Sequence, residues 1–419
     1  MDKIVIEGGI PLHGTVRISG AKNAALPIFA ATLITGGVYR ITNVPALRDV
    51  ATIASLLTEL GAKVENPSSG VYTVDTREAM GREATYELVK TMRASCLVLG
   101  PLLARFGSAK VSLPGGCAIG ERPIDLHLKG LAALGARINL DHGYVAVDAS
   151  GGLKGTRITM DLVTVTGVMN IMMAATRAKG TTVIENAARE PEVVALADFL
   201  NSMGARITGA GTAEIKVEGV EELHSADVEV IPDRIEAGTY LVAGAITGGA
   251  VDLEGIVPAH LANIVDKLRE CGCDIKENVS GVSLKAPEEI QPTRVTTSPY
   301  PGFPTDMQAQ IMALLTLAQG ASVIVETIFE NRFMHVAELR RMGADITVVG
   351  NTSTVKGVKG LSGAPLMATD LRASASLVLA GLAASGTSTI ARVYHLDRGY
   401  EKIEEKLKGL GAVIYREKA

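Results

Sequence analysis

The feature that most constrains the fold of this chain is an internal repeat. Six times, the apolar end of a helical pattern is followed by Gly, usually Ala, one further residue and a β-branched residue. These marker glycines recur roughly 70 residues apart, which is too long for most solenoid repeats. The six glycines are Gly61, Gly135, Gly204, Gly272, Gly343 and Gly411.

A second series of glycines runs in step with the first. Each ends an apolar stretch and precedes a run rich in β-branched residues, as a left-handed helix C-cap before a strand would. The repeat therefore predicts six copies of one unit: helix A, a strand, helix B and two further strands. The glycines of this second series are Gly36, Gly107, Gly180, Gly248, Gly320 and Gly386.

The two helices of each unit differ in character. Helix A is apolar nearly all round, as in residues 171–175 and 377–384, so it must be buried on most sides. Helix B is amphipathic, as in residues 193–203 and 400–410. We therefore predict an α/β fold of two lobes, each with three helices A inside and sheets around them. A continuous solenoid of six repeats is the alternative.

Composition excludes several classes of protein. Of 419 residues, 47% are hydrophobic and 21% charged, which is typical of a globular chain. There is no Trp, and the net charge is −4, so neither nucleic acid nor an anionic membrane is an expected partner. Residues 1–14 lack the pattern of a signal peptide, and the apolar runs are too short to span a membrane. Four cysteines favour a reducing cytoplasm.

Charged and polar residues recur where each helix A begins. Helix N-termini favour anions, because their N–H groups lack partners within the helix. If the lobes face each other through these ends, Lys22, Arg93, Arg234 and Arg372 would surround a small anionic ligand. The alternative is that these charges cap helices or bridge the lobes. The residues at these starts are Lys22, Asn23, Arg93, Thr164, Val165, Thr166, Asp233, Arg234, Thr305, Asp306, Asp370 and Arg372.

Arg122 and Arg332 are predicted to start helices B, and Arg398 lies just before the helix B of the sixth unit. The guanidinium fork matches carboxylate and phosphate oxygens. Between residues 113 and 123, three glycines, two prolines and Cys117 indicate an exposed loop that could close over a site. A thiol exposed near a cation should be reactive.

The other cysteines and the histidines have simpler interpretations. Cys96, Cys271 and Cys273 occupy apolar positions of the repeat, and no further ligand stands at a spacing typical of zinc, so no metal site is predicted. His127 and His335 are interpreted as helix-surface or hydrogen-bonding residues rather than catalysts.

The chain resembles the enolpyruvyl transferase family over essentially its whole length, in particular the members that act on a UDP-sugar. Agreement at nine separate places makes the resemblance specific. The segments that carry it are 20–27, 92–95, 114–120, 122–127, 232–238, 304–308, 330–333, 370–372 and 397–400.

The family fold is two inside-out α/β barrels of three repeats each, with two chain crossings. The resemblance thus implies a first lobe of residues 22–230, which carries the Gly-Gly-Cys loop and the UDP-sugar side. Residues 1–21 and 231–419 would form a second lobe with the catalytic aspartate. It also implies a monomer or weak oligomer that needs no cofactor.

The implied reaction is transfer of the enolpyruvyl group of phosphoenolpyruvate to the 3-hydroxyl of UDP-N-acetylglucosamine, the first committed step of peptidoglycan synthesis. By resemblance, Cys117 is the general acid, forms an adduct with phosphoenolpyruvate and is alkylated by its epoxide mimic. Asp306 would accept the hydroxyl proton, with Lys22 and Arg398 also catalytic. Phosphoenolpyruvate would be bound by Lys22, Asn23, Arg122, Arg332, Arg372 and Arg398. The UDP-sugar would be bound by Asn23, Arg93, Arg122, Pro123, Ile124, Asp125, Leu126, Thr164, Val165, Asp306 and Ile328.

One position departs from the common pattern of the family. Leu162 stands where some members have Lys, so it offers no charge to the diphosphate. Two alternatives stay open: a sister enzyme that acts on shikimate 3-phosphate, and a six-repeat binding scaffold without catalysis. The loop with Cys117 argues against the first. The joint presence of acid, base and cations argues against the second.

Overall fold

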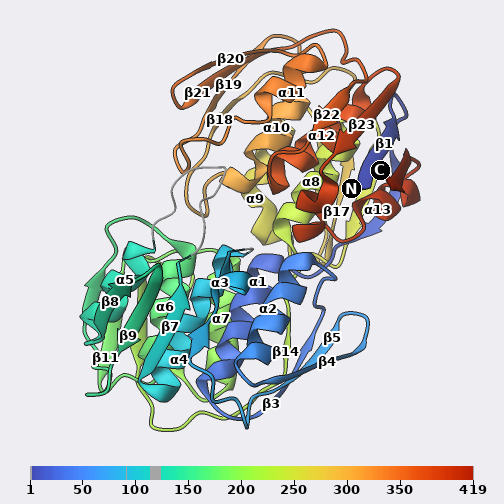
Figure 1. The fold of residues 1–419 in the computed structure, drawn as a ribbon. Coiled ribbons are helices and arrows are strands. Elements are labelled where there is room, and N and C mark those ends of the chain that lie inside the picture. Colours follow the sequence, from blue (N-terminus) through green and yellow to red (C-terminus); the bar gives the residue numbers. More distant parts are fainter. Residues whose placement is uncertain (1, 91, 114–123, 419) are drawn as a thin grey trace. The chain divides into compact units, whose positions relative to one another are not determined.

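The computed structural model describes residues 2–90, 92–113 and 124–418 (Figure 1). These residues form two compact units, each with its own hydrophobic core. Unit 1 combines residues 2–19 with 232–418, and unit 2 is made of the described residues between 20 and 231. Within the described residues the chain passes between the units after residue 19 and again after residue 231.

Three four-stranded sheets lie in the described part of unit 2. Its strands are β3 (Val38–Thr42), β4 (Lys63–Ser68), β5 (Val71–Asp75), β6 (Glu83–Ala84), β7 (Ser108–Ser112), β8 (Arg137–Asp141), β9 (Tyr144–Asp148), β10 (Arg157–Thr159), β11 (Thr181–Glu185), β12 (Arg206–Thr208), β13 (Glu214–Glu218) and β14 (Val228–Glu229). The sheet orders are β14-β3-β5-β4, β6-β7-β9-β8 and β10-β11-β13-β12. In each, the first pair is parallel and the other two pairs are antiparallel.

Unit 1 repeats this topology in three sheets of its described residues. Its strands are β1 (Asp2–Glu7), β2 (His13–Arg17), β15 (Ala250–Glu254), β16 (Asp274–Glu277), β17 (Gly281–Lys285), β18 (Arg294–Thr296), β19 (Ala321–Val325), β20 (Asp345–Val349), β21 (Thr352–Lys356), β22 (Pro365–Met367), β23 (Thr387–Ala391) and β24 (Val413–Lys418). The sheet orders are β16-β17-β15-β2, β18-β19-β21-β20 and β22-β23-β1-β24.

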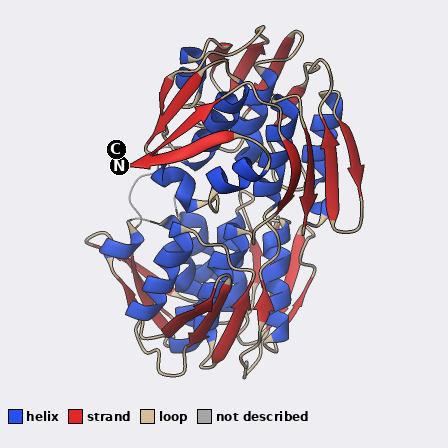
Figure 2. Ribbon diagram, turned by 90° about the vertical axis from the view of Figure 1, so that its right-hand side faces the viewer, coloured by secondary structure: helices blue, strands red, loops and turns tan. Residues whose placement is uncertain are grey.

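Helices lie inside each unit and the sheets lie outside them (Figure 2). The helices of unit 2 are α1 (Lys22–Ala31), η1 (Thr32–Ile34), α2 (Arg48–Glu59), α3 (Tyr86–Val89), η2 (Arg93–Val98), α4 (Leu99–Phe106), α5 (Asp125–Ala133), α6 (Val165–Ala175) and α7 (Pro191–Ser202). Those of unit 1 are α8 (Arg234–Ile246), η3 (Pro258–Leu261), α9 (Ala262–Glu270), η4 (Thr305–Met307), α10 (Gln308–Leu315), α11 (Val336–Arg341), α12 (Leu371–Ala383), η5 (Val393–Arg398) and α13 (Ile403–Gly409).

The burial of the helices follows their composition. In α6 every residue from Gly167 to Ala175 is buried, and in α12 every residue from Arg372 to Leu382 is buried. By contrast, α9 buries only Ile264, Val265 and Leu268, because its remaining residues are polar and face outward. The predicted class, apolar helices enclosed by sheets in two three-repeat lobes, is confirmed, and the continuous solenoid is excluded.

The predicted repeat lacked one strand. Each sheet has four strands rather than three, and the additional one pairs in parallel with the strand that follows helix A. In four of the sheets this strand directly precedes that helix, which makes a β-α-β crossover. The prediction missed these strands because they are short, as in Glu83–Ala84, and contain too few residues for an alternating pattern to be visible.

In the other two sheets the additional strand is followed in the sequence by a helix of the other unit. β2 of unit 1 pairs with β15 of the same unit, yet the next helix in the sequence is α1 of unit 2. β14 of unit 2 pairs with β3 of the same unit, yet the next helix is α8 of unit 1. The chain therefore crosses from one unit to the other directly after each of these two strands.

The marker glycines behave as predicted, with one exception. All six of the first series have positive φ, between 94° and 101°. Of the second series, five have positive φ, but Gly36 is not among the residues with positive φ. The prediction for Gly36 was wrong because α1 continues into the 3-10 turn η1 and ends at the extended residue Thr35, before the glycine is reached.

Candidate active site

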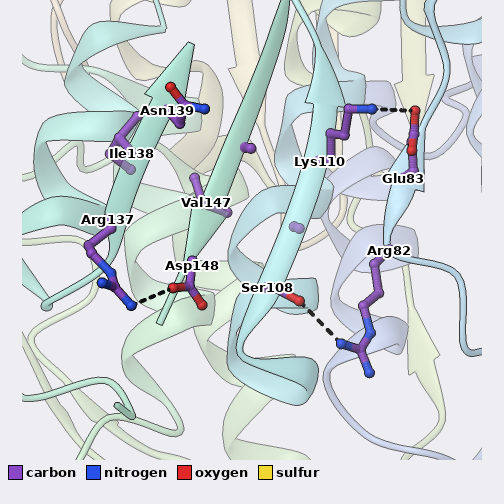
Figure 3. A pocket seen from close by; sticks show the side chains of 11 residues that line it. Arg82, Glu83, Ser108, Lys110, Arg137, Ile138, Asn139, Val147 and Asp148 are labelled. Carbon is purple, nitrogen blue, oxygen red and sulfur yellow. Dashed lines mark hydrogen bonds and ion pairs between the residues drawn. The ribbon is translucent and has the colours of Figure 1, made fainter. Parts of the chain in front are cut away.

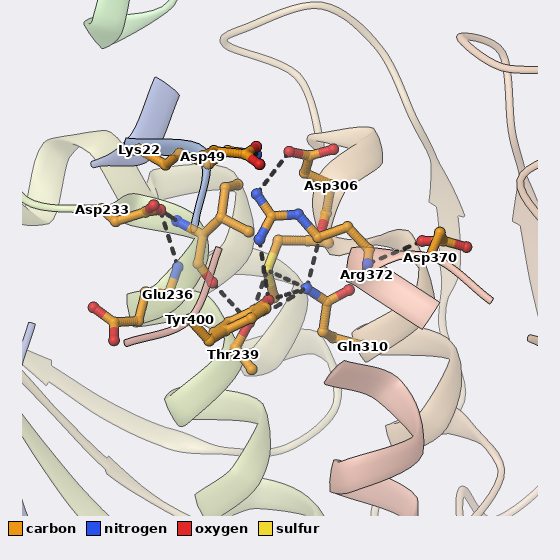
Figure 4. A network of polar contacts seen from close by, with 12 residues as sticks. Lys22, Asp49, Asp233, Glu236, Thr239, Asp306, Gln310, Asp370, Arg372 and Tyr400 are labelled. Carbon is orange, nitrogen blue, oxygen red and sulfur yellow. Dashed lines mark hydrogen bonds and ion pairs between the residues drawn. The ribbon is translucent and has the colours of Figure 1, made fainter. Parts of the chain in front are cut away.

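Asp306 of unit 1 is held between two arginines, of which Figure 4 shows Arg372. Arg332 Nη2 lies 2.8 Å from Asp306 Oδ1, and Arg372 Nη2 lies 2.9 Å from Asp306 Oδ2. Both arginine side chains are only 4% exposed, whereas the Asp306 side chain is 27% exposed. We call these three residues the Asp306 clamp. Each carboxylate oxygen is thus fixed by one guanidinium, and part of the carboxylate still faces solvent.

The start of α12 places Arg372 in the clamp. Asp370 caps this helix, since its Oδ1 accepts from the backbone N–H groups of Arg372 and Ala373 at 2.9 and 3.0 Å. Burial is the largest single influence and acts to lower the pKa of Arg372, but Asp306, Tyr400 and Asp233 together outweigh it, and the pKa lies above its usual range. Arg372 therefore stays charged although it is buried.

A turn ahead of α11 places Arg332, not the helix start that was predicted. Its guanidinium lies over the Phe329 ring, 5.3 Å from the ring centre. His335, at the start of α11, is buried near Arg332 and Asp370, and burial lowers the pKa of its imidazole to about 4. The surface position considered for His335 was therefore wrong.

Glu326 organises the segment beside the clamp, and the sequence did not single it out. This buried carboxylate accepts from the hydroxyls of Thr297 and Thr305, each at 2.8 Å, and from the backbone N–H of Ile328 at 2.8 Å. It therefore fixes Thr305, the neighbour of Asp306, and the turn at Ile328, whose side chain is exposed. An acidic residue directly after a buried strand was the available signal.

Arg398 ends η5 and is partly buried. The residue before it, Asp397, forms an ion pair with Arg416 of β24, with its carboxylate oxygens 2.7 and 3.1 Å from the guanidinium nitrogens. The hydrogen bonds that Arg416 donates to Asp397 raise its pKa, burial lowers it, and the hydrogen bonds to Glu404 raise it, so that the pKa lies above its usual range. This pair anchors the turn that carries Arg398.

Lys22 is the first residue of α1, as predicted, and Asn23 follows it. Lys22 Nζ lies 3.2 Å from Asp49 Oδ2, and their side chains are 13% and 5% exposed. Asp49 is buried in the first turn of α2. The sequence did not identify Asp49, because its pairing with Lys22 depends on how α1 packs against α2. The Asp49 carboxylate thus fixes the position of the Lys22 ammonium group.

A neutral network joins the helices of unit 2. Asn170 of α6 accepts from the backbone N–H of Gly100 at 2.6 Å, donates to the carbonyl of Cys96 at 3.0 Å, and contacts His127 Nδ1 at 3.0 Å. His127 Nε2 lies 3.2 Å from Thr166 Oγ1. We call Asn170, His127 and Thr166 the Asn170 network. Position 100 must be Gly, because a Cβ there would lie 2.2 Å from the carbonyl oxygen of Asn170.

The Asn170 network lies next to several residues assigned to UDP-sugar binding. Thr164 caps α6, where its hydroxyl accepts from Gly167 N at 3.3 Å, and Val165 is the first helical residue. Burial, and then the charge of Arg93, lower the pKa of His127 to about 4, so this buried imidazole is neutral near pH 7. The surface interpretation of His127 was wrong, and the hydrogen-bonding interpretation is confirmed.

The remaining predicted contacts are distributed as follows. Ile124 immediately precedes α5, and Asp125 and Leu126 are its first residues. Leu162 is 70% exposed just ahead of α6. Cys117, Arg122 and Pro123 lie outside the described residues. Arg234, which was predicted to join Lys22, Arg93 and Arg372, begins α8 over the Tyr300 ring, and that grouping stays a prediction.

The other cysteines are buried. Burial raises the pKa values of Cys96, Cys271 and Cys273 to about 12, which makes these thiols poor nucleophiles. Among the described residues, no group of three His, Cys, Asp or Glu side chains could hold a metal ion. Within the same residues, no helix is both long and apolar enough to span a membrane.

A hollow of about 450 Å³ lies on the sheet β6-β7-β9-β8 (Figure 3). Four of its five charged groups pair with one another, Lys110 with Glu83 at 3.0 Å and Arg137 with Asp148 at 2.9 Å, and the fifth, Arg82, donates to the Ser108 hydroxyl at 3.2 Å. None of the predicted site residues lines it. This hollow is therefore not the candidate active site.

Known proteins match this chain over its whole length. Residues 6–407 match the family model described as EPSP synthase (3-phosphoshikimate 1-carboxyvinyltransferase). A UDP-N-acetylglucosamine 1-carboxyvinyltransferase from Myxococcus xanthus is 60% identical, covering 100% of both chains. A protein of the same name from Geotalea uraniireducens is 60% identical over 99% of both.

Solved structures also match from end to end. The enolpyruvyl transferase NikO from Streptomyces tendae aligns with a TM-score of 0.89 at 28% identity, covering 100% of this chain and 99% of that chain. EPSP synthase from Acinetobacter baumannii aligns with a TM-score of 0.79, covering 100% of both chains. At 19% identity, this second match bears on the fold alone.

Proposed function

The chain belongs to the EPSP synthase family, and from its likeness to UDP-N-acetylglucosamine 1-carboxyvinyltransferases we propose that it acts on the same sugar nucleotide. It would transfer the enolpyruvyl group of phosphoenolpyruvate to the 3-hydroxyl of UDP-N-acetylglucosamine and release phosphate. This reaction is the first committed step of peptidoglycan synthesis. The structural observation that carries the proposal is the Asp306 clamp.

The clamp suits the addition step. The sugar hydroxyl oxygen bonds to C2 of phosphoenolpyruvate, its proton passes to the Asp306 carboxylate, and C3 takes a proton from an acid. A carboxylate fixed by two buried guanidinium groups is held in place to accept that proton. The same cations would stabilise the negative charge of a nearby phosphate or carboxylate.

The second step eliminates phosphate. C3 of the tetrahedral intermediate gives up a proton, the double bond between C2 and C3 re-forms, and the C2–O bond to phosphate breaks with its electron pair. By resemblance, Cys117 acts as the acid at C3, and Lys22 and Arg398 take part in catalysis. Phosphoenolpyruvate would be held by Lys22, Asn23, Arg122, Arg332, Arg372 and Arg398.

Unit 2 is proposed as the main UDP-sugar side, and unit 1 as the side with the base. The start of α5, with Asp125 and Leu126, and the start of α6, with Thr164 and Val165, expose backbone N–H groups suited to uracil and diphosphate oxygens. Arg93, Arg122, Pro123, Ile124, Asn23, Asp306 and Ile328 complete the proposed contacts. We propose a cytoplasmic monomer or weak oligomer without nucleic-acid or membrane partners.

The test is phosphate release from phosphoenolpyruvate, with UDP-N-acetylglucosamine and, separately, with shikimate 3-phosphate. Release with the UDP-sugar alone is the expected result. Release with shikimate 3-phosphate alone would reassign the substrate to that of EPSP synthase. Release with neither, from a protein that still binds UDP-N-acetylglucosamine, would favour the non-catalytic scaffold. Calorimetric titration with the UDP-sugar supplies the binding measurement.

A further inference from the structure

The buried phenol of Tyr400 lies where three helices of unit 1 meet (Figure 4). The side chain of Tyr400 is 2% exposed, and its hydroxyl is within hydrogen-bond distance of three groups. Arg372 Nη1 and Gln310 Nε2 both lie at 3.2 Å, and Thr239 Oγ1 lies at 2.9 Å. These three partners come from α12, α10 and α8, the helices A of three successive repeats.

The direction of each hydrogen bond follows from the donors available. Arg372 and Gln310 can only donate through these nitrogens, so the phenol oxygen accepts from them. Gln310 Nε2 also lies 3.3 Å from Thr239 Oγ1 and shares its second proton between the two hydroxyls. The Thr239 hydroxyl donates its own proton to the carbonyl of Ile235 at 2.7 Å. The Tyr400 proton therefore points to Thr239.

Two of these partners connect the phenol to Asp306. Arg372 contacts Tyr400 through Nη1 and the Asp306 carboxylate through Nη2 at 2.9 Å. Gln310 Nε2 also donates to the backbone carbonyl of Asp306 at 2.8 Å. A closed ring thus runs from the phenol through Arg372 to the carboxylate of Asp306, and back from its carbonyl through Gln310.

We propose that Tyr400 is a positioning residue, which fixes the Asp306 carboxylate through Arg372 and the Asp306 backbone through Gln310. This inference rests on the proposed function of Asp306 as the base. The buried phenol is too enclosed to touch a substrate, so it acts only through the residues of the ring. Orientation of a reacting group to within about 1 Å can change a rate about a hundredfold.

The chain offers a matched control for this proposal. Tyr240 lies in the same unit on α8 and is equally buried. Within the described structure its hydroxyl has no hydrogen-bond partner. Tyr400→Phe and Tyr240→Phe therefore remove the same atom from equally buried sites, but only the first change opens the ring.

Steady-state phosphate release with UDP-N-acetylglucosamine measures the effect. For Tyr400→Phe we expect kcat to fall about ten- to hundredfold, while KM for the UDP-sugar changes less than about threefold. For Tyr240→Phe, kcat should stay within about twofold of the unchanged protein. Equal losses in both variants, or a Tyr400→Phe variant with full kcat, would overturn the proposal.

A second variant and a structural readout complete the test. If Tyr400→Phe does not fold, Gln310→Met opens the other side of the ring and should lower kcat in the same way; full kcat in that variant counts against the ring. In a crystal structure of Tyr400→Phe, Arg372 Nη2 should move out of hydrogen-bond distance of Asp306. If the contact between Arg372 and Asp306 persists in this variant, the positioning role of Tyr400 is wrong. This structural result does not depend on activity, so it separates failure of the positioning role from failure of the proposed function.

Discussion

Two clusters of polar side chains, one in each unit, differ in electrostatic character. In unit 1 the Asp306 clamp is ionic, with the carboxylate of Asp306 between the buried arginines Arg332 and Arg372. In unit 2 the Asn170 network is neutral, because burial keeps His127 unprotonated near pH 7. Buried ion pairs often contribute less stability than apolar side chains of the same size. We therefore interpret the unit 1 charges as serving chemistry, and the unit 2 network as fixing helix starts for binding.

Asp306→Ala would break this comparison most strongly. Loss of a general base should lower kcat about 10³-fold. The same change leaves Arg332 and Arg372 without their shared carboxylate, so the free energy of unfolding should fall by about 3 kcal/mol. Phosphate release and urea unfolding measure the two effects, with exposed Asp345→Ala of the same unit as control. An unchanged rate would remove Asp306 as the base.

Asn170→Leu tests the role of the neutral Asn170 network in unit 2. The change leaves the backbone N–H of Gly100, the carbonyl of Cys96 and the His127 ring without their partner. We expect the free energy of unfolding to fall by about 3 kcal/mol, since buried polar groups would be left unpaired. At saturating substrates, kcat should fall less than about threefold. A loss of turnover as large as that of Asp306→Ala would contradict the division of roles.

Each unit also contains one buried histidine, so the loss of stability at acid pH can be compared between the two units. The pKa values of His127 and His335 are about 4, below the value of about 6.5 expected in an unfolded chain. As pH falls below about 6.5, the unfolded chain gains protons first, so stability is lost progressively down to about pH 4.

Between pH 7.5 and pH 5, each of these histidines should remove about 2 kcal/mol of stability. His127→Gln and His335→Gln should each reduce the acid dependence of urea unfolding by that amount. Exposed His224→Gln is the control. If only one of the two variants reduces the acid dependence, the units differ in how deeply they bury their imidazoles.

Leu162→Lys is expected to have the smallest effect, and it concerns unit 2 alone. Leu162 is 70% exposed ahead of α6, so a lysine there would lie in solvent near the proposed diphosphate contacts. An exposed charge pair is worth little, and we expect about threefold tighter binding of the UDP-sugar. Calorimetric titration measures it. Leu140→Lys, at a 62% exposed leucine of β8, should leave affinity unchanged, and an equal gain there would indicate a general charge effect.

Much of the fold could be predicted because short sequence patterns reveal the repeat. Marker glycines with positive φ and fully apolar helices are local signals, and they appear six times. The pairing of β2 with β15 and of β14 with β3 could not be predicted in this way. A strand of two residues such as Val228–Glu229 has no periodicity, and its partner strand is nearly 190 residues away in the chain.

The candidate site was predictable in its residues but not in its connections. The resemblance and the helix starts identified Lys22, Asp306 and Arg372. Asp49 and Glu326 were missed, because a buried carboxylate shows its purpose only through partners brought near by folding. The assignments of Cys117, Arg122 and Pro123 stay predictions, since those residues lie outside the described structure.

The pairing of β1 has a consequence for the order in which the molecule can assemble during synthesis. β1 pairs with β23 and β24, with Asp2 opposite Lys418. β1 must therefore wait until β23 and β24 have been synthesised before its sheet can close. Unit 2 is complete once Ile231 has been made, so it can fold while unit 1 is still being translated. Until their partner strands in unit 1 have been synthesised, β1 and β2 are unpaired strands, which a nascent chain must shield from other chains.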